Sequence, residues 1–336
     1  MNAGELARYR GWKAWQSHDM HVSLLSIFYL LLADRLAVPS VFSPWKSLVL
    51  VLSLGFYFMC GFLINDLFDL AHDLQAGKTR AVQRLPRPAF AGIIISFIAL
   101  IIIMLWYLGS AGYAAVYGFS FFLGTLYSAP GVRFKERGAL GIVVNALTEK
   151  AFPVLAIFVF FGHFGADTAL FVVTAFLLQT VEIFTHQIYD YEADQGAGVR
   201  TFARDAGRER TLLIFRYLVV PLSLAAMLLL CLLVVLLVPA LVLVIAAVCA
   251  VYLVLYLGVA RGRLSMEEKV LPLPMSVPYL LINNAFPVVL AFILVAVSPS
   301  NILLLFFALA SQIYLFRQLL RLLRERAIPR TEIADA

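Results

Sequence analysis

The chain has 336 residues, of which 62% are hydrophobic and 14% are charged, and its formal net charge is +6. Soluble domains carry about 45–50% apolar and about 25% charged residues, so this composition excludes an ordinary water-soluble protein. A helix that crosses a bilayer needs about 20 apolar residues, which leaves room for about ten such helices. The sequence therefore predicts an all-α, polytopic membrane protein.

Apolar runs separated by polar residues, proline or glycine predict the membrane-spanning helices. No segment between these runs is long enough for a separate soluble domain. We therefore expect a single transmembrane domain over residues 1–336, with a core near 17–300 and an extra helix at 301–322. In chain order, the predicted spans lie near 17–34, 46–64, 89–109, 112–129, 139–161, 166–188, 212–237, 239–259, 278–298 and 301–322.

Basic residues indicate which side of the membrane each connection faces. Most of the 26 Lys and Arg residues fall in alternate connections and near both termini, whereas Arg35 and Lys46 fall at the other face and Lys150 within a span. Cytoplasmic loops carry such an excess, so we expect both termini on the cytoplasmic side. The first twenty residues are polar and do not match a cleaved signal peptide, which favours a bacterial or archaeal cytoplasmic membrane. Loop charge of this kind explains the basic excess without a nucleic-acid partner.

Three aspartates, Asp66, Asp69 and Asp73, lie at the cytoplasmic end of the predicted span near 46–64. At about 100° per residue on a helix, they fall within an arc of about 60°, with Asn65 nearby. Carboxylates this close repel one another, so the arrangement is favourable if a cation lies between them. Oxygen ligands without His or Cys favour Mg²⁺ shared with phosphate oxygens.

A second acidic window, DYEAD, lies at the cytoplasmic end of the predicted span 166–188. Asp190 and Asp194 share one helical face, and Glu192 points away from it. Ionisable side chains within a membrane usually face the interior of a bundle or a wet cavity. The alternative of two solvated helix ends is less consistent with two clusters on one side and with the polar stripe that continues the second face, His186, Glu182 and Gln179.

Basic and hydroxyl side chains surround the two acidic windows. Each cation alone would be an ordinary positive-inside loop charge. Together they can hold diphosphate oxygens, arginine as a fork and lysine as a point charge, which indicates a magnesium-diphosphate site. These residues are Lys78 and Arg80 after the first window, Arg200 and Thr201 after the second, and Tyr127, Ser128, Arg133 and Lys135 in YSAPGVRFKERG.

These motifs resemble those of the UbiA superfamily of intramembrane prenyltransferases over roughly residues 20–300. The first family motif, NDxxDxxxD, is matched by Asn65, Asp66, Asp69 and Asp73. The second motif, DxxxD followed by Gly and a basic-Thr pair, is matched by Asp190, Asp194, Gly198, Arg200 and Thr201, and the YSxP segment by Tyr127, Ser128, Pro130, Arg133 and Lys135.

Family members often carry Arg-Pro-Leu after the first motif, where this chain reads KTRAVQRLPRP. The choice among Lys78, Arg80, Arg84 and Arg87 as the diphosphate ligand therefore stays open.

The resemblance implies a ring of about nine helices around a cavity that is roofed by cytoplasmic loops, and the span 301–322 departs from that count. It implies Mg²⁺-dependent transfer of a prenyl group from an allylic polyprenyl diphosphate to a lipophilic, aromatic acceptor such as a quinone or pigment precursor, within the bilayer. The catalytic residues would be Asp66, Asp69, Asp190 and Asp194, which together with Asp73 would also bind the metal.

Substrate contacts are expected from the residues around the motifs and from Asn145, Glu149, Glu182 and His186. Asn145 and Glu149 are four residues apart and could bind the acceptor, or Lys150 and a carboxylate could pair within the bundle. His186 could be a base for the acceptor proton or a structural histidine. The run with His18, Asp19 and His21 is expected to start a helix at the interface.

Two alternatives to an aromatic acceptor remain. The same fold could use a glycerol-phosphate or sugar-phosphate acceptor. An ion-coupled secondary transporter is also conceivable, but transporters tend to place such acids near the bilayer midplane, whereas these acids lie at loop junctions.

Overall fold

The computed structural model describes residues 9–33, 44–75, 86–196, 198–260, 273–313 and 315–317. All regular elements in these ranges are helical, which confirms the predicted all-α fold. The first half comprises α2 (Arg10–Ala14), η1 (Trp15–Asp19), α3 (Met20–Ala33), α4 (Pro44–Gln75), α5 (Arg87–Leu108), α6 (Ala111–Ser128), η3 (Phe134–Glu136), α7 (Ala139–Ala146), η4 (Leu147–Ala151) and α8 (Phe152–Phe161). The second half comprises α9 (Ala166–Tyr189), α10 (Tyr191–Gly196), α11 (Phe202–Ala206), α12 (Arg208–Ile214), η5 (Phe215–Val219), α13 (Val220–Leu237), α14 (Leu241–Ala260), α15 (Leu273–Leu280), η6 (Leu281–Ala285), α16 (Phe286–Val297), η7 (Pro299–Asn301) and α17 (Ile302–Ser311).

The length and hydropathy of these helices agree with a membrane protein. In the described part of the chain, three apolar helices have only 10–17 residues: Met20–Ala33, Leu241–Val254 and Pro299–Ser311. Each predicted span coincides with helix, although the last is described only as far as residue 317. Six described helices are long and apolar enough to cross a membrane: Trp45–Leu70, Pro88–Leu108, Ala139–Phe161, Ala166–Tyr189, Arg208–Leu237 and Met275–Val297.

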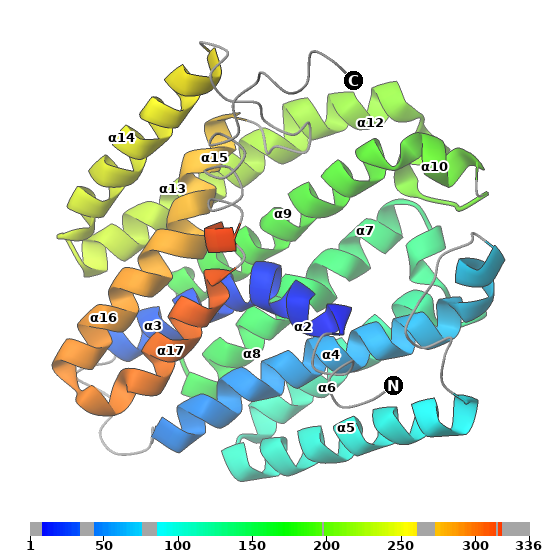
Figure 1. Cartoon of the computed structure of the whole chain (residues 1–336), viewed down its shortest axis with the longest axis horizontal. Coiled ribbons are helices and arrows are strands. Elements are labelled where there is room, and N and C mark those ends of the chain that lie inside the picture. The colour runs from blue at the N-terminus through cyan, green and yellow to red at the C-terminus, as the bar shows by residue number, and fades with distance from the viewer. Residues whose placement is uncertain are drawn as a thin grey trace, which may run out of the picture.

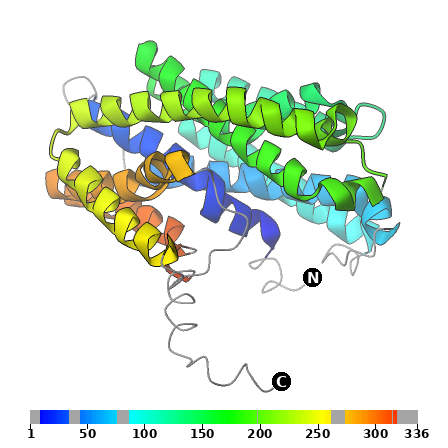
Figure 2. The same cartoon turned by 90° about the horizontal axis from the view of Figure 1, so that it is seen from above.

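The helices pack side by side in a closed ring. In order of contact, α4 packs on α6, α6 on α7 and α8, α7 and α8 on α9, α9 on α13, and α13 on α15. The segment from α15 to α16 then meets α17 and α3, both of which return to α4 (Figure 1). α5 packs on the outside of α4 (Figure 1), and α14 packs on α15 at one edge of the bundle (Figure 2).

Proline explains three breaks in the long helices. The π-helical turns η4, η5 and η6 are followed by Pro153, Pro221 and Pro287 at the start of the next helix. Proline cannot donate to the carbonyl four residues earlier and its ring clashes with it, so the helix widens locally into a π-turn. The η4 turn carries Glu149 and Lys150, so this widening changes the direction of polar side chains.

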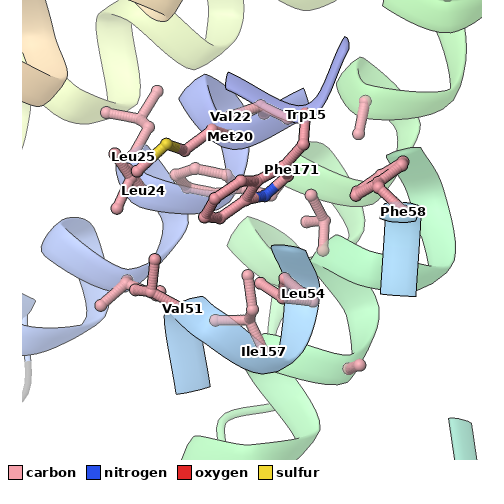
Figure 3. Close-up of a cluster of buried hydrophobic side chains, with 14 of the residues drawn as sticks. Trp15, Met20, Val22, Leu24, Leu25, Val51, Leu54, Phe58, Ile157 and Phe171 are labelled. Carbon is pink, nitrogen blue, oxygen red and sulfur yellow. The ribbon is translucent and has the colours of Figure 1, made fainter. Parts of the chain in front are cut away.

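The apolar core lies among η1, α3, α4, α8 and α9. Trp15, Leu24, Leu54, Ile157 and Phe171 are all buried within it (Figure 3). Burial of large apolar side chains fixes the relative positions of the helices through close packing. By contrast, α13 and α14 expose long rows of leucine and valine, as expected for helices that face lipid.

Candidate functional site

A cavity of about 760 Å³ opens between α4, α6, α7, η4 and α9, and residues of η1 and α15 complete its wall. We call it the central cavity. The part of the cavity next to the two acidic motifs, which we call the rim, is lined by Asn65, Tyr127, Ser128, His186 and Tyr189. Its deeper part, which we call the floor, is lined by Asp19, Tyr57, Asn145, Thr148, Glu149, Gln179, Glu182 and Tyr279.

The first acidic motif borders the cavity from the end of α4. Asn65 lines the cavity and accepts a hydrogen bond from the Ser128 hydroxyl at the end of α6. The next residue, Asp66, is 1% exposed and accepts a hydrogen bond from the hydroxyl of Tyr9. The segment before α2 therefore covers this carboxylate.

Asp69 is paired with the loop between α6 and α7. Lys135 Nζ donates to both carboxylate oxygens of Asp69 at 2.5 Å, and Arg133 Nη2 lies 3.5 Å from Oδ1. Burial lowers the pKa of Lys135, while the hydrogen bond and charge of Asp69 act in the opposite direction. Two of the cations predicted to hold diphosphate, Arg133 and Lys135, therefore already lie beside an acidic residue of the first motif.

Two backbone features position this loop. Arg133 has a φ of 39°, in the left-handed region that non-glycine residues rarely adopt, and its side chain binds Glu136 at 2.6 Å. A Cβ atom at Gly141 would lie 2.6 Å from the carbonyl oxygen of Phe134. The absence of a side chain at Gly141 therefore lets η3, which carries Lys135, pack directly on α7.

The second acidic motif begins where α9 ends. Tyr189 lines the central cavity, and Asp190 caps the helix with its N–H bonded to the carbonyl of His186 at 2.9 Å. His186 is largely exposed, and its Nδ1 lies 3.2 Å from Asp190 Oδ2. Since the residues just before Asp66 and Asp190 both line the cavity, the two motifs border one space.

Arg200 and Thr201 lie beyond the cavity wall. Thr201 caps α11 by accepting a hydrogen bond from the N–H of Arg204, and Arg200 lies 3.5 Å from Asp205. Their predicted contact with diphosphate stays a prediction. Lys78 and Arg80 lie outside the described residues, and so does the side chain of Asp73.

The donor atoms around the cavity suit a hard cation. Among the described residues, no three His, Cys, Asp or Glu side chains lie close enough together to hold a metal ion. The motifs nevertheless supply only carboxylate and amide oxygens at this rim, the ligand type that Mg²⁺ prefers. Asp66, Asp69 and Asp190 do not themselves line the cavity, whereas Asn65 and Tyr189, which directly precede Asp66 and Asp190, do.

Three side chains form a hydrogen-bonded group on the floor. Gln179 Nε2 donates to Asn145 Oδ1 at 2.9 Å and to Glu149 Oε2 at 2.5 Å. Asn145 Nδ2 in turn donates to Glu149 Oε1 at 2.8 Å. This arrangement places Asn145 and Glu149, which were predicted to bind substrate, at the surface of the cavity.

Lys150 forms an ion pair within the bundle, which is one of the two alternatives that the sequence left open. It is 2% exposed, and its Nζ donates to Glu182 Oε1 at 2.5 Å. The Tyr279 hydroxyl also lies 3.3 Å from this oxygen. Lys150 therefore pairs within the bundle, while Glu182 lines the cavity.

Four floor residues, Asp19, Tyr57, Thr148 and Tyr279, were not predicted to contribute to the site. The expectation that Asp19 starts a helix at the interface is wrong, because Asp19 is buried and lines the cavity. An acidic residue directly before a long apolar run was the available signal for it. Tyr57 and Tyr279 also line the cavity, and tyrosine within an apolar run gives no signal that separates a cavity wall from the core.

Comparison with known proteins identifies a family and several similar structures. The sequence matches the UbiA prenyltransferase family over residues 26–276. A structure of a UbiA homolog from Archaeoglobus fulgidus is 18% identical with a TM-score of 0.54, covering 89% of this chain and 95% of that chain. No curated protein matches the sequence significantly.

Two further structures of a UbiA homolog from Archaeoglobus fulgidus were determined with ligands. One, bound to DMAPP and Mg²⁺, is 18% identical with a TM-score of 0.53, covering 89% of this chain and 94% of that chain. The other, bound to GPP and Mg²⁺, is 19% identical with a TM-score of 0.52, covering 86% and 96%. At this level of identity the similarity establishes the shared fold.

Proposed function

Because this chain belongs to the UbiA prenyltransferase family, we propose that it transfers a prenyl group from an allylic diphosphate to a lipophilic, aromatic acceptor within the membrane and releases diphosphate. The observation that carries this proposal is the central cavity, which extends from residues beside both acidic motifs to a polar floor. Its volume of about 760 Å³ lies within the range of about 300–1,000 Å³ that is usual for small-molecule sites.

The diphosphate would lie at the cytoplasmic rim. Mg²⁺, which accompanies DMAPP and GPP in the similar structures, would neutralise the departing diphosphate when held by Asp66, Asp69, Asp73, Asp190 and Asp194. Lys135 and Arg133 lie beside Asp69 and would stabilise negative charge that grows on the leaving group. The amide of Asn65 and the hydroxyl of Ser128 add polar contacts at the same rim.

The acceptor would lie below the diphosphate, among aromatic side chains. Phe58, Phe62, Phe121, Tyr57 and Tyr127 line the cavity. Aromatic faces attract cations, so this wall would stabilise positive charge on the allylic carbon as the carbon–oxygen bond breaks. The same apolar wall would exclude water, which would otherwise capture the prenyl group.

The loss of a proton from the acceptor completes the transfer. The cavity wall offers proton acceptors at two depths: Glu149 and Glu182 on the floor, and His186 at the rim. The acidic motifs lie at the ends of α4 and α9, and this position, together with the family membership, disfavours the transporter alternative. A glycerol-phosphate or sugar-phosphate acceptor remains the second candidate.

The test uses purified protein in lipid nanodiscs with Mg²⁺, geranyl diphosphate and one acceptor at a time. We expect diphosphate release and a prenylated product, identified by mass spectrometry, with a lipophilic phenol such as an alkylhydroquinone. Product with glycerol 1-phosphate and none with the phenol would contradict the aromatic assignment. No diphosphate release with any acceptor would contradict the proposed reaction itself.

A further inference from the structure

The floor of the central cavity contains a carboxylate without a partner. Asp19 of η1 is 5% exposed and lines the cavity. Within the part of the chain that the structure describes, Asp19 makes no side-chain hydrogen bond and no ion pair. Gln179 Oε1 is also unpaired but has almost no accessible surface, whereas both carboxylate oxygens of Asp19 retain some. A ligand in the cavity can therefore reach Asp19.

Hydrogen bonds to α17 hold the chain on both sides of Asp19. Gln16 Nε2 donates to the carbonyl oxygen of Ala310 at 2.6 Å, and His21 Nε2 lies 3.1 Å from the carbonyl oxygen of Ser311. These contacts keep η1 against the bundle, so its carboxylate stays in the cavity wall. The family match begins at residue 26, so Asp19 lies in a part of the chain that the match does not cover.

The other charges around the floor do not neutralise Asp19. Glu149 and Glu182 line the same cavity, and among the described residues that line it there is no lysine or arginine. Lys150 acts on Asp19 electrostatically, as both glutamates do, but its ammonium group is bound to Glu182 at 2.5 Å. An unpaired buried charge is costly. The floor therefore has an excess of negative charge that a positively charged ligand would neutralise.

An organic cation suits the floor better than a metal ion does. Among the described residues, no three His, Cys, Asp or Glu side chains lie close enough together to hold a metal. The wall beside Asp19 is aromatic instead, since Tyr57, Phe58 and Tyr279 line the cavity. Aromatic faces attract ammonium groups. A lipophilic molecule with an ammonium group would therefore match both the charge and the aromatic wall.

The floor is also separate from the cations near the rim. Gln179 of the floor and Tyr189 of the rim lie on the same helix, about 15 Å apart along its axis. Lys135 and Arg133 pair with Asp69 of the first acidic motif, next to the rim. A diphosphate would be attracted to these cations and repelled by the acidic floor, and an ammonium group would behave in the opposite way. Charge would thus orient two substrates within one cavity.

We propose that Asp19 pairs with an ammonium group of the lipophilic acceptor, and that the floor thereby selects acceptors that carry a positive charge at the end remote from the diphosphate. This inference rests on the proposed function, because it describes the acceptor end of the same cavity. A phospholipid amine offers the same ammonium group, but its phosphate would face the acidic floor. The floor charge therefore favours an acceptor without phosphate.

The first experiment measures equilibrium binding of three probes of similar shape to the wild-type protein in phosphatidylcholine nanodiscs at neutral pH, with empty nanodiscs to correct for partition into lipid. The probes are 2-naphthylmethylamine, which is cationic, 2-naphthylmethanol, which is neutral, and 2-naphthoate, which is anionic. We expect the amine to bind at least about tenfold more tightly than the alcohol, because it forms a hydrogen bond between charged groups. Equal affinity of the amine and the alcohol, as expected if a proton neutralises Asp19, or tighter binding of naphthoate would overturn the inference.

A second arm of this experiment distinguishes the acceptor from a lipid headgroup. Phosphatidylethanolamine is added to the nanodiscs, and binding of 2-naphthylmethylamine is measured again. We expect its affinity to be unchanged. Competition by this lipid that disappears in Asp19→Asn would assign the floor to a lipid headgroup and overturn the assignment to the acceptor.

The second experiment compares variants of Asp19 with a matched control. Asp19→Asn removes the charge with little change of shape and should abolish the preference for the amine over the alcohol, whereas Asp19→Glu keeps the charge and should retain it. Asp167→Asn makes the same substitution outside the cavity lining, in a carboxylate that accepts a hydrogen bond from the Tyr29 hydroxyl at 3.0 Å, and should also retain the preference. An unchanged preference in Asp19→Asn would overturn the assignment.

Failure of this inference can be distinguished from failure of the proposed function. The binding measurements require no turnover, and the wild-type probe series decides alone if Asp19→Asn does not fold. If the amine shows no advantage while geranyl diphosphate is still consumed with an acceptor, the role of Asp19 is wrong and the reaction stands. If the amine binds best but no acceptor supports diphosphate release, the cation site stands and the proposed reaction is wrong.

Discussion

Lys135 donates to both carboxylate oxygens of Asp69 and thereby joins the loop after α6 to the end of α4. The pair brings a cation of the YSxP segment to the first acidic motif, although 66 positions separate the two residues. Lys135 can therefore neutralise Asp69 before substrate binds and lies where a diphosphate would arrive.

The first prediction is that Lys135→Met lowers kcat/KM for the allylic diphosphate about 10- to 100-fold. A hydrogen bond to a charged group contributes about 1.5–3 kcal/mol, and about 1.4 kcal/mol corresponds to a factor of ten. Arg210→Met removes the same charge from an exposed position on α12 and serves as the control. An unchanged kcat/KM in Lys135→Met at saturating Mg²⁺ would show that this lysine does not bind the donor.

The second prediction concerns the acidic motifs. Asp66→Asn, Asp69→Asn, Asp190→Asn and Asp194→Asn should each lower Mg²⁺-dependent diphosphate release by about 100-fold or more, because each removes a carboxylate that would hold the Mg²⁺ needed to neutralise the departing diphosphate. Asparagine has nearly the same shape, so folding should be retained. Glu209→Gln, at an exposed position on α12, is the control, and wild-type rates in all four variants would remove the proposed site.

The third prediction tests the packing that positions Lys135. Gly141→Ala should displace η3 and lower kcat/KM for the donor by at least about tenfold, because the added Cβ would lie 2.6 Å from the Phe134 carbonyl oxygen. Gly118→Ala on α6 meets no atom within 4 Å and should be neutral or stabilising by about 0.5–1 kcal/mol. Equal donor kinetics in the two variants would show that this contact does not position Lys135.

The fourth prediction concerns the buried ion pair. Lys150→Met should lower the free energy of unfolding by about 3–5 kcal/mol, because it leaves Glu182 without its cation in the wall of the cavity. The double variant Lys150→Met/Glu182→Gln should recover most of that loss. Arg200→Gln, at an exposed pair, should cost less than about 1 kcal/mol. Denaturation in mixed detergent micelles measures all three, and a single variant as stable as the wild type would contradict the prediction.

The fifth prediction concerns orientation in the membrane. The connections beside both acidic motifs should face the cytoplasm, because alternate loops carry most basic residues. Cysteines introduced by Gly196→Cys and Ser300→Cys in a Cys249→Ser background would be tested with a membrane-impermeant thiol reagent on intact cells. Only Ser300→Cys should be labelled, and labelling of Gly196→Cys alone would reverse the proposed topology.

Much of the fold follows from the sequence by itself. Bilayer thickness sets the length of an apolar run, so hydropathy located the apolar helices between α3 and α17 without knowledge of their partners, whereas the short polar helices α10 and α11 were not predicted. The period of the α-helix sets which side chains share a face, which grouped Asp66 with Asp69 and extended the second motif back to Glu182 and Gln179. Both rules act within one helix, where neighbours in sequence are neighbours in space.

The tertiary structure alone decided which faces of different helices meet. The pairs Lys135–Asp69 and Lys150–Glu182 join separate helices. Asp19 of η1 and Gln179 of α9 line one cavity, and η1 packs on α4. These contacts depend on how side-chain volumes fit between helices, aided by the π-turn before Pro153 that turns Glu149 and Lys150. Hydropathy assigns nearly equal values to many apolar side chains of different shape, so it does not show which helix faces meet. The acidic floor and the unpaired Oε1 of Gln179 therefore form only when the helices pack.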